Sequence, residues 1–144
     1  MANLQFYTDG KSVNPDLFDG IARNIADSFV RIVGEGYNRK SCGVGRTQMR
    51  RLYDEVKRFE QNLDGKEETW NKHYPYIKMI KSKLSYNITR AIEKNRDSDT
   101  GYKKLSEFIT DGIDQVKNED DYRVFVALFE AVYGFYYEKS PREN

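Results

Sequence analysis

Residues 47–59, Thr-Gln-Met-Arg-Arg-Leu-Tyr-Asp-Glu-Val-Lys-Arg-Phe, place apolar side chains at intervals of three and four among a dense set of cations. This one-sided spacing is typical of an amphipathic helix that packs one face against a core. The pattern continues to Leu63 and stops before Asp64 and Gly65, while Thr47 is a suitable N-cap. The stretch therefore predicts a packed helix with a positively charged outer surface.

The same periodicity recurs in both directions from this stretch. It predicts further helices over about 14–33, over about 74–94, over about 15 residues after Gly101, and from about 119 onward. The last helix, from Tyr122 to Tyr137, is apolar nearly all round, so we expect it to be the central and most buried one. No alternating strand pattern longer than a few residues is present. The expected fold class is all-α, a single-domain bundle of five to six helices.

Length and composition agree with one domain. A chain of 144 residues can bury a core without disulfides or metal, so we assign residues 1–144 to a single helical domain. Residues 37–46 lack periodicity and predict a mobile basic loop, and a short flexible tail is expected from about 138. A single cysteine, no signal-peptide pattern and no long apolar run predict a cytoplasmic protein with no membrane segment.

Little in the chain indicates catalysis. His73 is the single histidine and has no metal-ligating neighbour at a suitable spacing, so we expect it to lie in an exposed loop. Residues 43–47 place glycines before a helix but lack the full spacing of a phosphate-binding loop. Glu130, an acid on an otherwise apolar helix, is interpreted as a polar lock between neighbouring helices. We therefore expect no enzyme, no cofactor and no metal site.

Positive charge is concentrated in two segments. Residues 39–60 carry seven cations and three anions, and residues 72–96 carry seven cations and one anion. In the first segment, Asp54 and Glu55 lie within helical reach of several arginines and can neutralise them. The cations of this helix fall on two flanks, with Arg46, Arg50 and Lys57 on one side and Arg51 and Arg58 on the other.

The second basic segment is the less neutral one. Three of its lysines have no acid three or four residues away: Lys78, Lys81 and Lys83. Lys83, Arg90 and Lys94 share a narrow arc of the predicted helix, beside Met79 and Tyr86. Cations interleaved with an aromatic side chain indicate contact with a nucleic-acid backbone and stacking on a base. An acidic protein that binds the basic faces is the alternative partner.

Three stretches resemble one known family. Residues 46–56 are similar to the "T-Q-hydrophobic-R-K-hydrophobic-hydrophobic-x-E-V" stretch of the small subunit of the type III-A CRISPR Csm interference complex. Residues 83–90 resemble its "K-L-x-Y-x-x-x-R" helix, and residues 126–136 resemble its "F-x-E-A-hydrophobic-hydrophobic-x-Y" terminal helix. The three stretches occur in the family's order, although the glycine-rich ending of many members is absent after Tyr137.

The resemblance implies a helical, non-catalytic subunit present in several copies along crRNA and target RNA in a ribonucleoprotein for antiviral defence. Its partners would be these RNAs, the other Csm subunits and copies of itself. By motif match, Arg46, Arg50, Arg51, Lys83 and Arg90 would contact the RNA backbone, and Tyr86 and Glu130 would pack. With the cations from the charge pattern, the candidate RNA-binding residues are Arg46, Arg50, Arg51, Lys57, Lys78, Lys83, Arg90 and Lys94. The alternative is a helical protein-interaction module.

Overall fold

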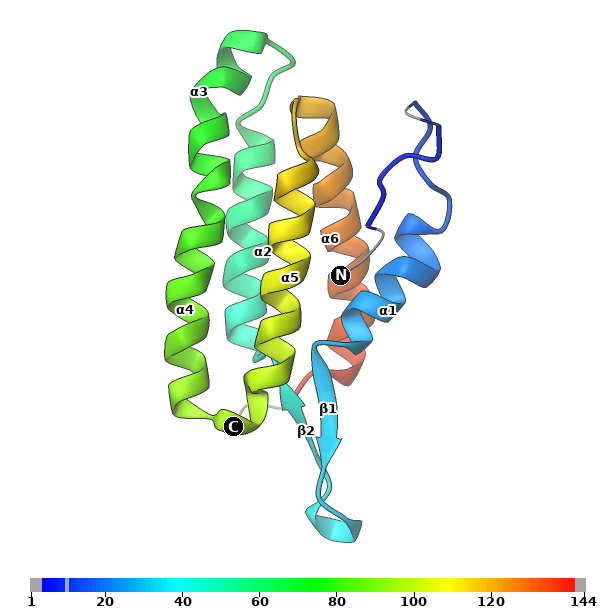
Figure 1. Ribbon diagram of the computed structural model, residues 1–144, viewed down its shortest axis with the longest axis vertical. Coiled ribbons are helices and arrows are strands. Elements are labelled where there is room, and N and C mark those ends of the chain that lie inside the picture. Colours follow the sequence, from blue (N-terminus) through cyan, green and yellow to red (C-terminus); the bar gives the residue numbers. More distant parts are fainter. Residues whose placement is uncertain (1–3, 10, 142–144) are drawn as a thin grey trace.

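The computed structural model describes residues 4–9 and 11–141 (Figure 1). A π-helical turn, Leu17–Ile21, leads into the first helix, and 3-10 turns span Gly36–Asn38 and Arg96–Ser98. The helices and strands are α1 (Ala22–Asp27), β1 (Val30–Val33), β2 (Lys40–Gly43), α2 (Arg46–Gln61), α3 (Glu67–Lys78), α4 (Ile80–Lys94), α5 (Asp99–Gln115) and α6 (Glu119–Lys139). The predicted all-α bundle is confirmed, with one small β-hairpin added to it.

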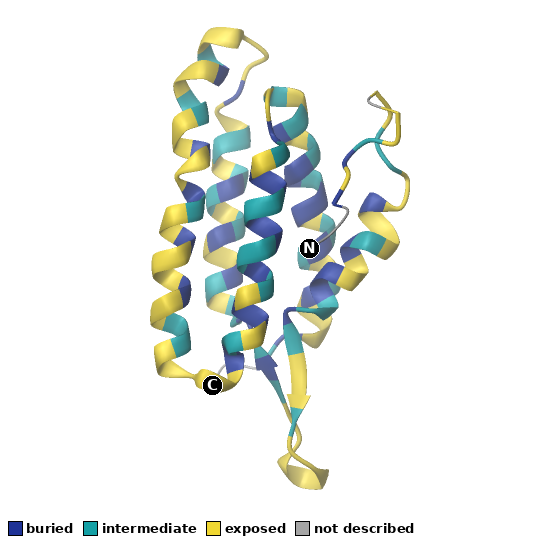
Figure 2. Cartoon of the chain, in the orientation of Figure 1, coloured by how far each residue is buried: buried dark blue, intermediate teal, exposed yellow. Residues whose placement is uncertain are grey.

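Helix α6 is central, as its nearly continuous apolar sequence predicted. It packs against α1, α2 and α5, and the buried side of each neighbour faces it (Figure 2). Phe125 and Phe129 are fully buried and meet Phe108 of α5, with ring centroids 5.8 and 5.6 Å apart. Burial of large aromatic side chains supplies most of the driving force for joining these helices.

Two buried tyrosines of α6 also make polar contacts across the core. The Tyr122 hydroxyl donates to the Val56 carbonyl oxygen at 2.7 Å, and the Tyr136 hydroxyl donates to the Val44 carbonyl oxygen. Burial raises the pKa of Tyr122 well above its ordinary value, so the phenol stays protonated and keeps donating. These bonds fix the register of α6 against α2 and against the segment that precedes α2.

Replacing Tyr122 by phenylalanine should lower the free energy of unfolding by about 1 kcal/mol, because the buried hydrogen bond is lost while the ring remains. Urea denaturation followed by circular dichroism measures the change. Tyr86→Phe is the matched control, because Tyr86 is 63% exposed. Equal stability of the two variants would contradict a stabilising role for the Tyr122 bond.

The β-hairpin corrects two predictions. Residues 30–33, expected to end the first helix, form β1, and residues 40–43 of the expected mobile loop form β2. The strands pair antiparallel, from Val30 opposite Gly43 to Val33 opposite Lys40. The β-branched residues of β1 favour a strand, but its four-residue length hid the pattern, and β2 has no alternation of its own.

The hairpin reaches the bundle through two glycines. A Cβ atom on Gly101 of α5 would lie 2.3 Å from the Phe29 carbonyl oxygen and 3.0 Å from the Gly43 Cα atom. Gly43 itself has φ 141°, a conformation that favours glycine. The helix expected after Gly101 begins earlier than predicted: α5 begins at Asp99, and Gly101 lies inside the helix. Glycine at position 101 allows the backbone at the base of the hairpin to lie close to α5, and it does not end a helix.

The helix predicted over 74–94 is two helices. Helix α3 begins at Glu67 and contains Pro75, and α4 begins after Met79. Pro75 therefore lies inside α3 rather than at a helix start, and the helix buries Trp70 before the proline and Ile77 after it. The missing proline N–H weakens this helix just before the break.

The end of the chain also differs from its prediction. Helix α6 runs to Lys139, and Ser140 is buried, so residues 138–140 are not a flexible tail. The Ser140 hydroxyl donates to the Tyr137 carbonyl oxygen at 2.7 Å. Pro141 follows the helix, and residues 142–144, the last of the predicted tail, lie outside the described residues.

Candidate nucleic-acid interface

A groove of about 330 Å³ runs between α2 and α4, with part of α5 at its floor. Its polar rim combines one arginine of α2 with three cations of α4: Arg51, Lys83, Arg90 and Lys94. Its floor is apolar and includes Leu52, Leu84 and Leu105. The predicted clustering of Lys83, Arg90 and Lys94 is confirmed, and the tertiary fold adds Arg51 to them.

The groove is positively charged because one carboxylate faces four cations. Glu55 of α2 pairs with Lys83, with 3.2 Å between the carboxylate oxygen and Nζ. Within residues 4–9 and 11–141, no carboxylate lies within 4.0 Å of Arg51, Arg90 or Lys94. These three cations have their charge available for an anion at the groove, where the apolar floor excludes water from one side.

Cross-helix ion pairs change part of the expected neutralisation pattern, while Asp54 pairs with Arg50 of its own helix as expected. Helical spacing placed Glu55 with Arg51 and Arg58, but the carboxylate contacts Lys83 of α4 instead. Lys81, expected to have no acid partner, pairs with Asp114 of α5, with 2.5 Å between Nζ and Oδ1. Spacing along one helix reports only neighbours on that helix, so it missed carboxylates that other helices supply.

Tyr86 stands at the edge of the groove instead of packing inside the protein. It is 63% exposed, which corrects the packing role that the resemblance implied. Arg90 donates from Nη1 to the Tyr86 hydroxyl at 3.3 Å, and its guanidinium carbon lies 5.9 Å from the ring centroid. The pair presents an aromatic face beside a cation on the same surface.

The other four candidate cations lie outside the groove. Arg46 stacks on Tyr137 at 4.6 Å, and its Nε donates to the Ser140 hydroxyl at 2.6 Å. Arg50 lies 3.9 Å from Asp54, and Lys78 lies 4.9 Å from the centroid of the Tyr74 ring. The fourth is Lys57. Each of the four contacts a neighbouring side chain, and none of them lines the groove that Arg51 and Arg90 share.

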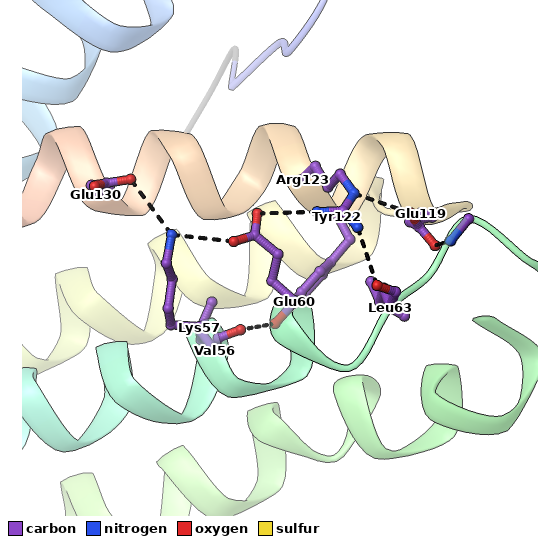
Figure 3. A network of polar contacts seen from close by, with 9 residues as sticks. Val56, Lys57, Glu60, Leu63, Glu119, Tyr122, Arg123 and Glu130 are labelled. Atoms are coloured by element: carbon purple, nitrogen blue, oxygen red, sulfur yellow. Dashed lines mark hydrogen bonds and ion pairs between the residues drawn. The ribbon is translucent and has the colours of Figure 1, made fainter. Parts of the chain in front are cut away.

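Lys57 belongs to a network that joins α2 to α6 (Figure 3). Its Nζ lies 3.2 Å from Glu60 and 3.9 Å from Glu130, and the hydrogen bond that Lys57 donates to Glu60 raises the pKa of Lys57. Arg123 continues the network, with Nε 3.0 Å from Glu119. The expected ion pair between Glu130 and a neighbouring helix is present, but 63% of the Glu130 side chain is exposed, so this surface contact holds the helices only weakly. The same exposure corrects the packing role that the resemblance implied for Glu130.

The groups considered for other chemistry have structural partners. The Gly45 N–H, in the glycine loop before α2, donates to the Tyr102 hydroxyl at 3.1 Å and is therefore not directed at a ligand. His73 lies half-buried in α3 with its ring 6.4 Å from Phe59, which corrects the expected exposed loop. The described residues contain no group of three or more His, Cys, Asp or Glu side chains that could hold a metal ion.

Two residues of the groove were missed by the sequence analysis. Gln48 of α2 and Asn87 of α4 line it and offer amide groups beside the cations. Asn87 lies four residues after Lys83 and three before Arg90, so helical spacing placed it on the same face. Asn87 is uncharged, so the charge pattern does not indicate it. The place of Gln48 in the groove follows only from the way in which α2 and α4 face each other.

The fold and the groove together define a helical-bundle protein with a cationic surface suited to an anionic partner. Comparison with protein families gives its place among known proteins: the model of the family Csm2 Type III-A matches residues 17–140. The chain therefore belongs to this family, the small subunit of the Csm complex, and is a structural subunit of a type III-A CRISPR complex. Searches of curated proteins and of solved structures found no match. No helix among the described residues is long and apolar enough to span a bilayer.

Proposed function

We propose that this protein is a non-catalytic RNA-binding subunit of its CRISPR effector, acting in the cytoplasm in antiviral defence. It lines the path of crRNA and target RNA together with other Csm subunits and copies of itself. The observation that carries the proposal is the groove in which Arg51, Arg90 and Lys94 have no carboxylate within 4.0 Å among the described residues. An RNA strand supplies regularly spaced phosphates that match such a row of cations.

The groove favours contact with phosphates over the reading of bases. Arg51 and Arg90 lie on different helices and offer guanidinium forks, which suit phosphate oxygens in bidentate geometry. Gln48 and Asn87 add amide groups, which also bond to phosphate and ribose oxygens. A guide of arbitrary sequence requires contacts of this kind, because base pairing between guide and target carries the sequence information.

Each copy should bind weakly when isolated. Four cations per groove give only a small electrostatic gain at physiological salt. Several copies held along one RNA raise each other's effective concentration, so contacts that are weak singly become stable together. Affinity in the complex then comes from repetition rather than from one tight site.

The isolated protein should bind single-stranded RNA of about 40 nucleotides with a log–log salt slope of about −3 from the groove cations alone. Each neutralised phosphate on a single strand contributes about −0.7 to this slope. Fluorescence anisotropy at about 50 and 200 mM salt, with two unrelated RNA sequences, measures it. An affinity that does not change with salt concentration, or that differs strongly between the two RNA sequences, would refute recognition of the RNA backbone.

A further inference from the structure

The β-hairpin projects beyond the base of the bundle (Figure 1). Its tip is exposed in Figure 2, and Tyr37 in the turn Gly36–Asn38 is completely exposed to solvent. Large aromatic side chains in open solvent gain nothing from the fold of their own chain. The position of Tyr37 is therefore suited to a contact with another molecule.

Three cations and one acid lie near this tyrosine: Arg39 and Lys40 follow it along the chain, Arg31 lies in the facing strand, and Glu35 precedes it. The register places Arg31 opposite Cys42 and Val33 opposite Lys40, so the side chains of Arg31 and Lys40 lie on one face of the hairpin. Arg39 joins the turn to β2. In the part of the chain that the structure describes, no carboxylate lies within 4.0 Å of Arg39 or Lys40.

The base of the hairpin is held by contacts with the bundle. The Ser41 hydroxyl donates to the Lys139 carbonyl oxygen at 2.8 Å, and Arg31 donates from Nη2 to the Asp97 carbonyl oxygen at 3.1 Å. The close approach of Gly43 to α5 adds a third anchor. A two-stranded hairpin is marginal by itself, so these anchors determine where its tip stands relative to α5 and α6.

We propose that the hairpin tip is a second RNA contact, in which an unpaired base stacks on Tyr37 while Arg39 and Lys40 hold the flanking phosphates. This inference rests on the proposed function and adds a site separate from the groove. A fully exposed aromatic ring with adjacent unpaired cations combines the two requirements of single-strand binding. The apolar Ile32 lies on the opposite face of the hairpin, opposite Ser41, so the face that carries Arg31 and Lys40 has Val33 as its one large apolar side chain and favours RNA over an apolar protein surface.

The test uses the full chain and a single-stranded RNA of about 12 nucleotides that carries 2-aminopurine, whose fluorescence falls when it stacks. Tyr37→Ala should weaken binding about tenfold and abolish the quenching, because stacking on one aromatic side chain is lost. Tyr37→Phe should keep both properties, since its ring still stacks. Tyr76→Ala is the matched control, because Tyr76 is 57% exposed on α3, away from the hairpin.

The outcomes separate this proposal from that of the groove. Unchanged affinity and quenching in Tyr37→Ala overturn the hairpin contact. If the groove variant, Arg51→Glu combined with Arg90→Glu, then loses binding, the proposed function still stands. Loss in Tyr37→Ala with full binding by the groove variant supports the hairpin and overturns the groove. A change in self-association by sedimentation, with RNA affinity unaltered, would show that the tip contacts protein and overturn the proposal.

Discussion

Arg51→Glu combined with Arg90→Glu should reduce the affinity for single-stranded RNA at least about 100-fold, because two charge-assisted contacts of about 1.5–3 kcal/mol each are replaced by repulsion. Arg51 and Arg90 are chosen because no carboxylate among the described residues lies within 4.0 Å of either. Lys83 is a poorer choice, since its charge is already partly neutralised by Glu55 at 3.2 Å. Fluorescence anisotropy at low salt measures the loss.

The control for this double variant is Arg50→Glu combined with Lys78→Glu, which changes the net charge by the same amount. Arg50 and Lys78 are exposed cations of the bundle that lie outside the groove. If the groove binds RNA, this variant should retain affinity within about threefold, the residual effect of long-range charge. An equal loss in both variants would mean that net charge, and not the groove, decides binding. Circular dichroism on each variant excludes loss of fold.

Gly101→Ala should destabilise the protein by about 3 kcal/mol, although glycine to alanine inside a helix ordinarily stabilises by about 0.5–1 kcal/mol. The sign reverses because the new Cβ would lie 2.3 Å from the Phe29 carbonyl oxygen and 3.0 Å from the Gly43 Cα atom. Both of these are backbone atoms, so no side-chain rotation can relieve the contact. Either α5 or the base of the hairpin must move, with loss of buried surface around Phe29.

Gly134→Ala on α6 is the matched control for this prediction. A Cβ at Gly134 would have no atom within 4 Å apart from its chain neighbours and the nearby backbone of α6, and the residue is exposed. This variant should therefore gain about 0.5–1 kcal/mol from its higher helix propensity. Chemical denaturation of the two variants beside the wild type gives both values. A gain in both would show that the hairpin does not dock closely on α5.

Much of the fold was accessible from residue spacing. The stripe in residues 47–63 predicted α2 nearly to its ends, and the apolar run from Tyr122 to Tyr137 predicted the central position of α6. Both helices bury apolar side chains that recur at helical spacing, and this periodicity is a stronger signal than the conformational preferences of single residues. The division of α3 from α4 at Met79 was missed because the apolar period continues across it, and only backbone geometry marks the break.

The candidate site was predicted in part. Lys83, Arg90 and Lys94 share one helix, so their common face follows from helical geometry alone. The spacing assigned charge to Arg46 and Lys57 but left out the side chains that engage them, Tyr137 and Glu60. Tyr137 belongs to α6, which a pattern along α2 cannot contain, whereas Glu60 lies three residues after Lys57 on the same helix, so helical spacing alone is enough to pair them.

The sequence by itself determined most of the helical segments, which helix is most apolar and where positive charge accumulates, because these depend on residues close together in the chain. The tertiary structure alone decided that Arg51 joins Lys83 across a groove, that Glu55 neutralises Lys83, and that a strand at 30–33 finds its partner at 40–43. Each of these depends on which elements face one another. Which elements face one another follows from the packing of the whole core. In that core Gly101 allows the backbone of the hairpin to approach α5 closely, and no local sequence pattern predicts this contact.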